Sequence, residues 1–267
     1  MTLTSETSPT PAQSADADSR RVAASPALRL LRAEFRLIRR DPLVLTFVFV
    51  FPVVTMLIIG GAFGTEPDPA FGGTDPSQWY VASYFTVVIA STGLVMLPVH
   101  LASYRERGVL RRFAASGFPR WSFAVAEIVV GLATIAVAGV VLLAVAAPVY
   151  GVPPVQDVPR VLAGVSLGSV AFVSIGVLLG TLLPSARAAQ AVGLMLFFPS
   201  FLLGAGGPPP AVMGAALKHV GDVLPLTWVT TSIREPWLGI GDATGSLLLV
   251  AVLAGVALVA AVRRCAL

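Results

Sequence analysis

The chain has 267 residues, of which 56% are hydrophobic and 12% are charged, and its mean hydropathy is +0.85. A soluble domain has about 25% charged residues, and one core cannot bury this much apolar surface, so the composition excludes a soluble globular domain and indicates a membrane protein. The net charge of +4 does not indicate a nucleic-acid partner, because the basic residues lie beside apolar stretches without a pattern of stacking aromatic residues.

The first 25 residues are rich in Ser, Thr, Pro, Ala and Asp and contain almost no large apolar side chain. Such a segment cannot bury enough surface to fold, so we expect residues 1–25 to be a disordered cytoplasmic tail. They do not resemble a signal peptide, because acidic residues precede every basic one and no apolar segment follows before Leu43. The first span is therefore expected to insert the chain.

Residues 26–41 predict an amphipathic helix that lies on the inner leaflet of the membrane. Ser25 can cap this helix and Pro26 suits its first position. Apolar residues at helical spacing alternate with arginines; the apolar ones are Leu28, Leu31, Phe35 and Ile38. Two roles stay open for the helix: anchoring on lipid phosphates, or contact with a partner protein through Arg29, Arg32 and Arg36.

Residues 42–267 contain six apolar stretches that are long enough to cross about 30 Å of hydrocarbon as helices. These predicted spans are residues 43–64, 80–101, 121–150, 161–183, 186–206 and 245–262. Each is bounded by charged residues or by proline, which do not belong in lipid. The sequence therefore predicts one six-helix transmembrane domain.

The distribution of basic residues predicts how this domain is oriented. Six spans place both termini on one side, and the segments on that side carry fifteen arginines, whereas the other side carries only Arg160, Lys218 and Arg234. Cytoplasmic loops carry the excess of basic residues, so both termini are expected in the cytoplasm.

The loop after the second span, residues 104–121, reads YRERGVLRRFAASGFPRW and is unusually rich in charge. Its apolar residues are few and Gly117 and Pro119 interrupt it, so it is poorly suited to lie in lipid. One interpretation is a basic loop that only fixes the topology of the chain. The alternative is a surface that binds another protein.

This loop resembles the segment after the second span of ABC transporter type-2 permeases. That segment typically reads Arg-Glu-x-Gly, a small or β-branched residue, Leu, a basic run with a hydrophobic end, and then Pro and an aromatic residue. The matching positions are Arg105, Glu106, Gly108, Val109, Leu110, Arg111, Phe113, Pro119 and Trp121. A second resemblance lies after the fifth span, at Pro199, Gly204 and residues 208–210 and 224–227.

The resemblance covers most of the chain and implies an all-α polytopic membrane protein. On this basis we expect residues 104–120 to form a cytoplasmic coupling helix that docks on an ATP-binding cassette subunit. The expected contacts are Arg105, Glu106, Arg107, Gly108, Leu110, Arg111 and Arg112. The chain then needs no cofactor itself, because ATP and magnesium bind to the partner subunit.

The apolar parts of residues 204–244 are too short to span and too apolar for a free loop, and the same resemblance implies that they are short external re-entrant helices. An ordinary folded external loop is the alternative. The sequence departs from the family at Glu127, where members often have a lysine. Glu127 lies less than two turns from the cytoplasmic end of span 3, so we expect its carboxylate to reach lipid headgroups or Arg120. A proton or substrate site within the membrane is the alternative.

No catalytic site is expected in the chain. The only lysine, Lys218, is not part of a phosphate-binding G-x-x-x-x-G-K-[ST] loop. Residues 164–168 match the G-x-S-x-G pattern of serine hydrolases, but they lie inside an apolar helix and not at a strand-to-helix turn. We interpret Gly164 with Gly168, and Gly176 with Gly180, as small-residue pairs that let helices pack closely.

No metal site is expected either, because His100 and His219 are far apart in the sequence and the single cysteine, Cys265, lies near the C-terminus. We interpret both histidines as interfacial or capping residues.

Six helices enclose too little space for a conduit and its gate, so we expect two permease chains, identical or related, with spans 1 and 5 near the seam. Six phenylalanines are expected to line or abut an apolar pathway: Phe47, Phe49, Phe51, Phe197, Phe198 and Phe201.

A pathway without central charges favours a hydrophobic or amphipathic small molecule, such as a drug or secondary metabolite, as in the daunorubicin-resistance-type exporters that the chain resembles. Export of polysaccharides or lipid-linked polymers is the alternative. An ion-coupled transporter and an intramembrane protease are less favoured. The expected location is the bacterial plasma membrane.

Overall fold

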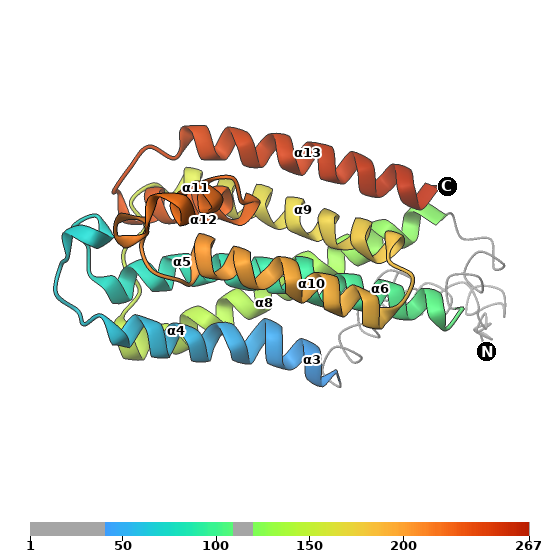
Figure 1. Cartoon of the computed structure of the whole chain (residues 1–267), viewed down its shortest axis with the longest axis horizontal. Coiled ribbons are helices and arrows are strands. Elements are labelled where there is room, and N and C mark those ends of the chain that lie inside the picture. The colour runs from blue at the N-terminus through green and yellow to red at the C-terminus, as the bar shows by residue number, and fades with distance from the viewer. Residues whose placement is uncertain (1–40, 109–119, 267) are drawn as a thin grey trace, which may run out of the picture.

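Our computed structural model describes residues 41–108 and 120–266, which form the bundle of long helices in Figure 1. These ranges contain no strand and only one isolated β-bridge, between Asp68 and Thr74. Six helical segments within them are long and apolar enough to cross a membrane: Leu45–Ala62, Pro76–Glu106, Ala124–Tyr150, Val158–Leu182, Ala186–Ala205 and Thr244–Arg264. The predicted all-α fold with six spans is confirmed. The predicted tail (1–25) and almost all of the predicted amphipathic helix (26–41) lie outside the described residues.

Three of the spans combine α-helical and π-helical segments. Span 1 consists of α3 (Pro42–Val44), η1 (Leu45–Val50) and α4 (Phe51–Ala62), span 2 of α5 (Pro76–Ala90), η3 (Ser91–Met96) and α6 (Leu97–Glu106), and span 5 of α10 (Ala186–Ser200) and η4 (Phe201–Ala205). A proline lies two residues from each π-helical segment: Pro52, Pro98 and Pro199. Proline has no N–H to donate and its ring clashes with the preceding turn. Pro52 and Pro98 follow their π-helical segments, so the wider turn before each of them relieves this clash, whereas Pro199 precedes its segment.

The other three spans are continuous helices: α8 (Arg120–Tyr150), α9 (Val158–Leu182) and α13 (Thr244–Ala266). Short helices occupy the connections. The 3-10 turn η2 (Pro69–Phe71) lies between spans 1 and 2, and η5 (Pro210–Val212), α11 (Ala215–Asp222) and α12 (Pro225–Leu238) lie between spans 5 and 6. At 8 and 14 residues, α11 and α12 are too short to cross a membrane.

The two ends of the bundle differ in charge. We call one the arginine-rich end; it carries Arg105, Arg187, Arg263 and Arg264. Side chains from spans 2, 3, 4 and 6 meet in a small buried cluster near this end, formed by Leu101, Ala124, Val177 and Ala261. The opposite, distal end holds the span 1–2 connection, α11 and α12 (Figure 1).

Span 2 forms the centre of the bundle, since 89% of its most apolar window is buried, against 22% for spans 1 and 6. It packs against α9, α10, α12 and α8. Spans 1, 5 and 6 instead expose large apolar side chains, among them Ile58, Met195 and Val252. This pattern is typical of a bundle whose outer helices face lipid or another chain.

Glycines in α9 bring it close to its neighbours. A Cβ at Gly176 would lie 2.3 Å from the carbonyl oxygen of Gly93, and one at Gly164 would lie 2.7 Å from that of Ser232. Cβ positions at Gly168 and Gly180 would collide with Val229 and Leu101. The interpretation of these glycines as helix-packing pairs is therefore confirmed, and Ser166 between them lies inside a helix.

Candidate functional site

Arg105, the first residue of the predicted coupling contact, joins two spans at the arginine-rich end. Its Nη1 donates hydrogen bonds to the carbonyl oxygens of Gly180 at 3.1 Å, Thr181 at 2.6 Å and Leu183 at 3.0 Å. The carbonyls in the last turn of a helix have no partner within it, and the negative end of the helix dipole favours a cation there. Arg105 thus ties the end of span 2 to the end of span 4.

Glu106 and Arg107 end the second span and are exposed to solvent. The backbone N–H of Arg107 bonds to the Ser103 carbonyl, and that of Gly108 to the Arg105 carbonyl. Gly108 has a φ of +68°, a left-handed conformation that favours glycine and stops the helix. The glycine that matches the family pattern at position 108 is therefore explained by the local backbone conformation.

The rest of the predicted contact lies outside the described residues. This holds for Leu110, Arg111 and Arg112, and also for Arg29, Arg32 and Arg36 of the predicted second contact. Their roles stay predictions.

His100 links the start of span 1 to the end of span 2. Its Nε2 lies 3.6 Å from Oδ2 of Asp41, and its ring packs on the Tyr104 ring with centroids 5.7 Å apart. Asp41 also accepts a hydrogen bond from the backbone N–H of Val44, which caps the first turn of span 1. His100 is thus part of the contact between two spans, and the other histidine, His219, is exposed on α11.

Five of the six phenylalanines expected along the pathway form one aromatic cluster. The Phe51 ring contacts the rings of Phe47, Phe197, Phe198 and Phe201, with centroid distances of 5.9, 5.7, 6.3 and 5.2 Å. Phe197 and Phe201 are buried, whereas Phe198 is 41% exposed. The cluster joins spans 1 and 5, the two spans expected at a seam. Phe49 is partly buried against the core.

A family model described as ABC-2 type transporter matches residues 27–236, which include the first five spans, the charged loop after span 2 and most of α12. The chain belongs to the ABC-2 type transporter family. The permease is accordingly a transport subunit and not a catalytic one, and membership implies an ATP-binding partner and association of permease chains in general. Comparison with curated proteins finds no match.

One of the two contacts expected for Glu127 is not present. Its side chain is only 2% exposed, so it does not reach lipid headgroups from the end of span 3. The other expected contact, with Arg120, involves a side chain outside the described part of the chain and stays a prediction. Sequence position gives the depth of a residue in a helix but not the face on which the folded bundle places it.

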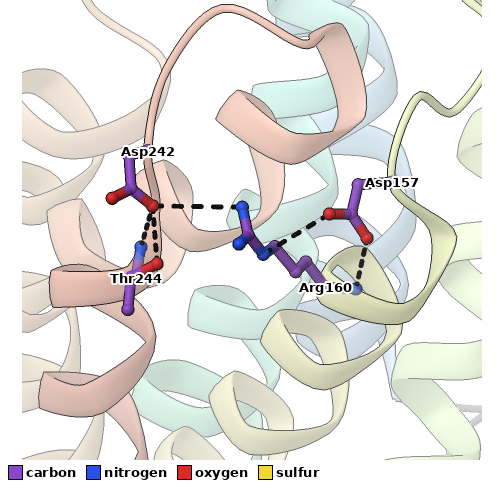
Figure 2. A network of polar contacts seen from close by, with 4 residues as sticks. All are labelled: Asp157, Arg160, Asp242 and Thr244. Atoms are coloured by element: carbon purple, nitrogen blue, oxygen red, sulfur yellow. Dashed lines mark hydrogen bonds and ion pairs between the residues drawn. The ribbon is translucent and has the colours of Figure 1, made fainter.

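The distal end of the permease is held together by polar contacts between connections (Figure 2). Asp157 caps α9 through the Arg160 N–H, and the Arg160 guanidinium lies 3.4 Å from Asp157 and 3.9 Å from Asp242. Asp242 accepts hydrogen bonds from the backbone and side chain of Thr244 at the start of α13, and these bonds lower the pKa of its carboxyl. The network links the starts of spans 4 and 6.

The short helix α12 is fixed at its C-terminal end to the connection between spans 3 and 4. The indole N–H of Trp237 donates to the Pro153 carbonyl at 3.0 Å, and the N–H groups of Gln156 and Asp157 bond to the carbonyls of Trp237 and Pro236. Leu226, Val229 and Ile233 on the same helix are fully buried. α12 is thus a built-in part of the bundle.

A cavity of about 400 Å³ lies at the distal end, between the end of span 5, α12, Trp79 of span 2 and the start of α13. Its charged lining residues are Arg234, Glu235 and Asp222, and its other polar ones include Thr227, Thr231 and Ser246. Leu202 of span 5 and Leu249 of span 6 add an apolar side.

Arg234 is the most unusual residue of this cavity. Its guanidinium carbon lies 3.8 Å from the centroid of the Trp79 ring, Nη1 lies 3.4 Å from Ser83 Oγ, and Nε is buried without a hydrogen-bond partner among the described residues. Burial lowers the pKa of Arg234 to about 10, and the charge of Glu235 opposes this change. The side chain is therefore still a cation at neutral pH.

Sequence patterns alone do not reveal this cavity, and in them Arg234 counts only as one of the few basic residues on the distal side. The available signal was Arg234-Glu235, a pair of opposite charges directly after an apolar segment too short to span. Such a pair is costly to bury without a specific reason.

Proposed function

We propose that the permease is the membrane subunit of an ATP-driven ABC exporter that moves a hydrophobic or amphipathic small molecule, such as a drug or secondary metabolite, out of the cell. The observation that carries the proposal is the aromatic cluster around Phe51, which continues into the exposed apolar faces of spans 1 and 5. The resemblance to daunorubicin-resistance-type exporters supports the same cargo class.

The cost of removing the cargo from water is the physical reason to expect a hydrophobic or amphipathic cargo. An unpaired charged group that leaves water for an apolar pathway costs several kcal/mol. Among the described residues, the rings that contact Phe51 and Phe197 all belong to phenylalanines, so the pathway there would offer apolar contacts. An amphipathic molecule that enters from the inner leaflet avoids this cost, whereas a charged glycan does not.

Coupling to ATP hydrolysis would start at the charged loop after span 2. Glu106 and Arg107 are exposed there, in reach of a partner, and Arg105 connects the same turn to the end of span 4. A push on this loop by an ATP-binding subunit would therefore move spans 2 and 4 together. ATP and magnesium would bind only in that subunit.

The working unit would contain two permease chains, identical or related, and two ATP-binding subunits. The arginine-rich end would face the cytoplasm of a bacterial cell, with the tail 1–25 and the surface helix 26–41 on the same side. α11 and α12 would then be re-entrant helices at the outer mouth. A helix that enters the membrane without crossing it must be buried in protein, and Leu226, Val229 and Ile233 of α12 are fully buried.

Reconstitution tests the proposal. The permease and its ATP-binding subunit would be placed in liposomes, and ATPase stimulation would be measured with amphipathic drugs and with charged glycans. We expect stimulation by drugs, and its loss in the double variant Glu106→Ala and Arg111→Ala, which leaves membrane insertion unchanged. Stimulation by glycans alone would reject the drug cargo, and full stimulation in the double variant would reject the coupling contact.

A further inference from the structure

The cavity at the distal end has a feature that a merely structural pocket does not need, namely a buried cation without an ion-pair partner. Arg234 lines the cavity and is only 7% exposed, and among the described residues no carboxylate lies within ion-pair distance of its guanidinium. A buried charge without a counter-charge is costly, so a ligand oxyanion next to the guanidinium would be favoured. The Trp79 ring and Ser83 Oγ hold the guanidinium in place.

The charges around the cavity favour a ligand that carries both signs of charge. Glu235 follows Arg234 on α12 and Asp222 ends α11, and both acidic residues line the cavity together with Arg234. A plain anion would be repelled by the acidic residues, and a plain cation would leave Arg234 without a counter-charge. A ligand that carries an oxyanion and a protonated amine a few bonds apart satisfies both groups.

The apolar side of the cavity indicates what is attached to this headgroup. Leu202 of span 5 and Leu249 of span 6 line the cavity and are 50% and 47% exposed on the outer surface of the bundle. Both belong to spans that face lipid or another chain. An acyl chain could therefore lie along these leucines while the headgroup occupies the cavity, whose volume of about 400 Å³ lies within the usual range for small-ligand sites.

We propose that this cavity binds a zwitterionic amphiphile of the phosphoethanolamine type, with its phosphate oxygen at Arg234 and its ammonium group at Glu235 and Asp222. The chemistry is shared by a membrane lipid and by free phosphoethanolamine, and the leucine rim favours the lipid. This ligand class follows only from the residues that line the cavity and does not depend on the identity of the transported cargo.

The test measures lipid binding to the full-length permease in detergent by native mass spectrometry. The probes are dihexanoyl phosphatidylethanolamine, the matching choline and glycerol lipids, and free phosphoethanolamine. We expect saturable binding of the ethanolamine lipid, at least about tenfold weaker binding of the glycerol lipid, which lacks the amine, and weak binding of free phosphoethanolamine. Equal binding of all three lipids would overturn the proposal, and equal binding of the free headgroup would assign the site to a soluble ligand.

Two variants locate the binding in the cavity without changing the buried Arg234. Glu235→Gln removes the contact for the amine, and Ser246→Phe fills the cavity from α13; each should weaken binding of the ethanolamine lipid about tenfold. Leu248→Phe is the matched control, since Leu248 is on the same helix, 64% exposed and not part of the cavity lining. Unchanged binding in both cavity variants, with melting temperatures like that of the control, would overturn the proposal.

Discussion

Arg105 has two roles that the sequence alone does not separate. The resemblance assigns it to a contact with a partner subunit, whereas in the structure it donates hydrogen bonds to three carbonyl oxygens at the end of span 4. Arg105→Ala should lower the free energy of unfolding by about 0.5–1.5 kcal/mol, because the carbonyls lose a charged donor that water replaces only in part. Thermal unfolding in detergent measures this. Arg107→Ala, in the exposed turn next to it, should leave stability unchanged, and equal destabilisation by both would contradict the role of Arg105.

Glu235 gives the distal end a dependence on pH. Burial raises the pKa of its carboxyl above the ordinary 4.5, Arg234 opposes the change and Asp242 adds to it. A carboxyl whose folded pKa is raised favours the folded state below 4.5, and this contribution is lost as the pH rises through the folded pKa. Glu235→Gln should therefore flatten the fall in melting temperature above pH 4.5. Glu66→Gln, at an exposed carboxylate, is the control, and a parallel effect of both variants would contradict the prediction.

At the scale of elements, the contact between span 2 and span 4 depends on backbone proximity. The carbonyl oxygen of Gly93 occupies the place where a Cβ at Gly176 would be, only 2.3 Å away. Gly176→Ala should therefore separate the two helices and destabilise the permease by about 1–3 kcal/mol, as overpacking does. Gly255→Ala in span 6 meets no atom within 4 Å and should be neutral. The pair is compared by thermal unfolding, and equal stability would contradict the tight contact.

Accessibility of cysteines tests how α12 and the preceding segment sit at the distal end. Thr230 is fully buried on α12 and its hydroxyl lies 2.9 Å from that of Thr86, whereas Val212 is 62% exposed. In a Cys265→Ser background, Thr230→Cys should be protected from a membrane-impermeant maleimide in intact cells, and Val212→Cys should react. Rapid labelling of position 230 would contradict the packed position of α12.

Features that depend on one stretch of sequence could be predicted, whereas features that depend on contacts between distant residues could not. The six spans were predictable because a membrane sets their length and excludes charge along it. The π-helical segments were not, although Pro52, Pro98 and Pro199 mark them, because proline allows several local solutions. The cavity was not predictable either, since Trp79, Leu202, Arg234 and Ser246 come from four separate elements and meet only in the folded bundle.

At the scale of the whole molecule, the faces of the bundle predict where a second chain binds. Spans 1 and 5 share the aromatic cluster and expose Ile58, Met195 and Phe198, at 65%, 67% and 41%. Span 6 also exposes apolar residues, such as Val252 at 66%, but it lies on the other side of the bundle from span 1 (Figure 1). Aromatic side chains are enriched in the centre of protein interfaces, and α13 offers none. The face of spans 1 and 5 is therefore the expected seam.

Photo-crosslinking distinguishes the two faces, whether the second chain is identical or related. Benzoyl-phenylalanine would be placed at Ile58 or, as the matched control, at Val252, and the complex with the ATP-binding subunit would be irradiated in membranes. Both positions are similarly exposed, so capture by collision alone would be equal. We expect a permease–permease adduct from position 58 and adducts with lipid from position 252, identified by mass spectrometry. Chain-to-chain adducts from position 252 alone would move the seam to span 6, because an apolar face that contacts only lipid cannot hold two chains together.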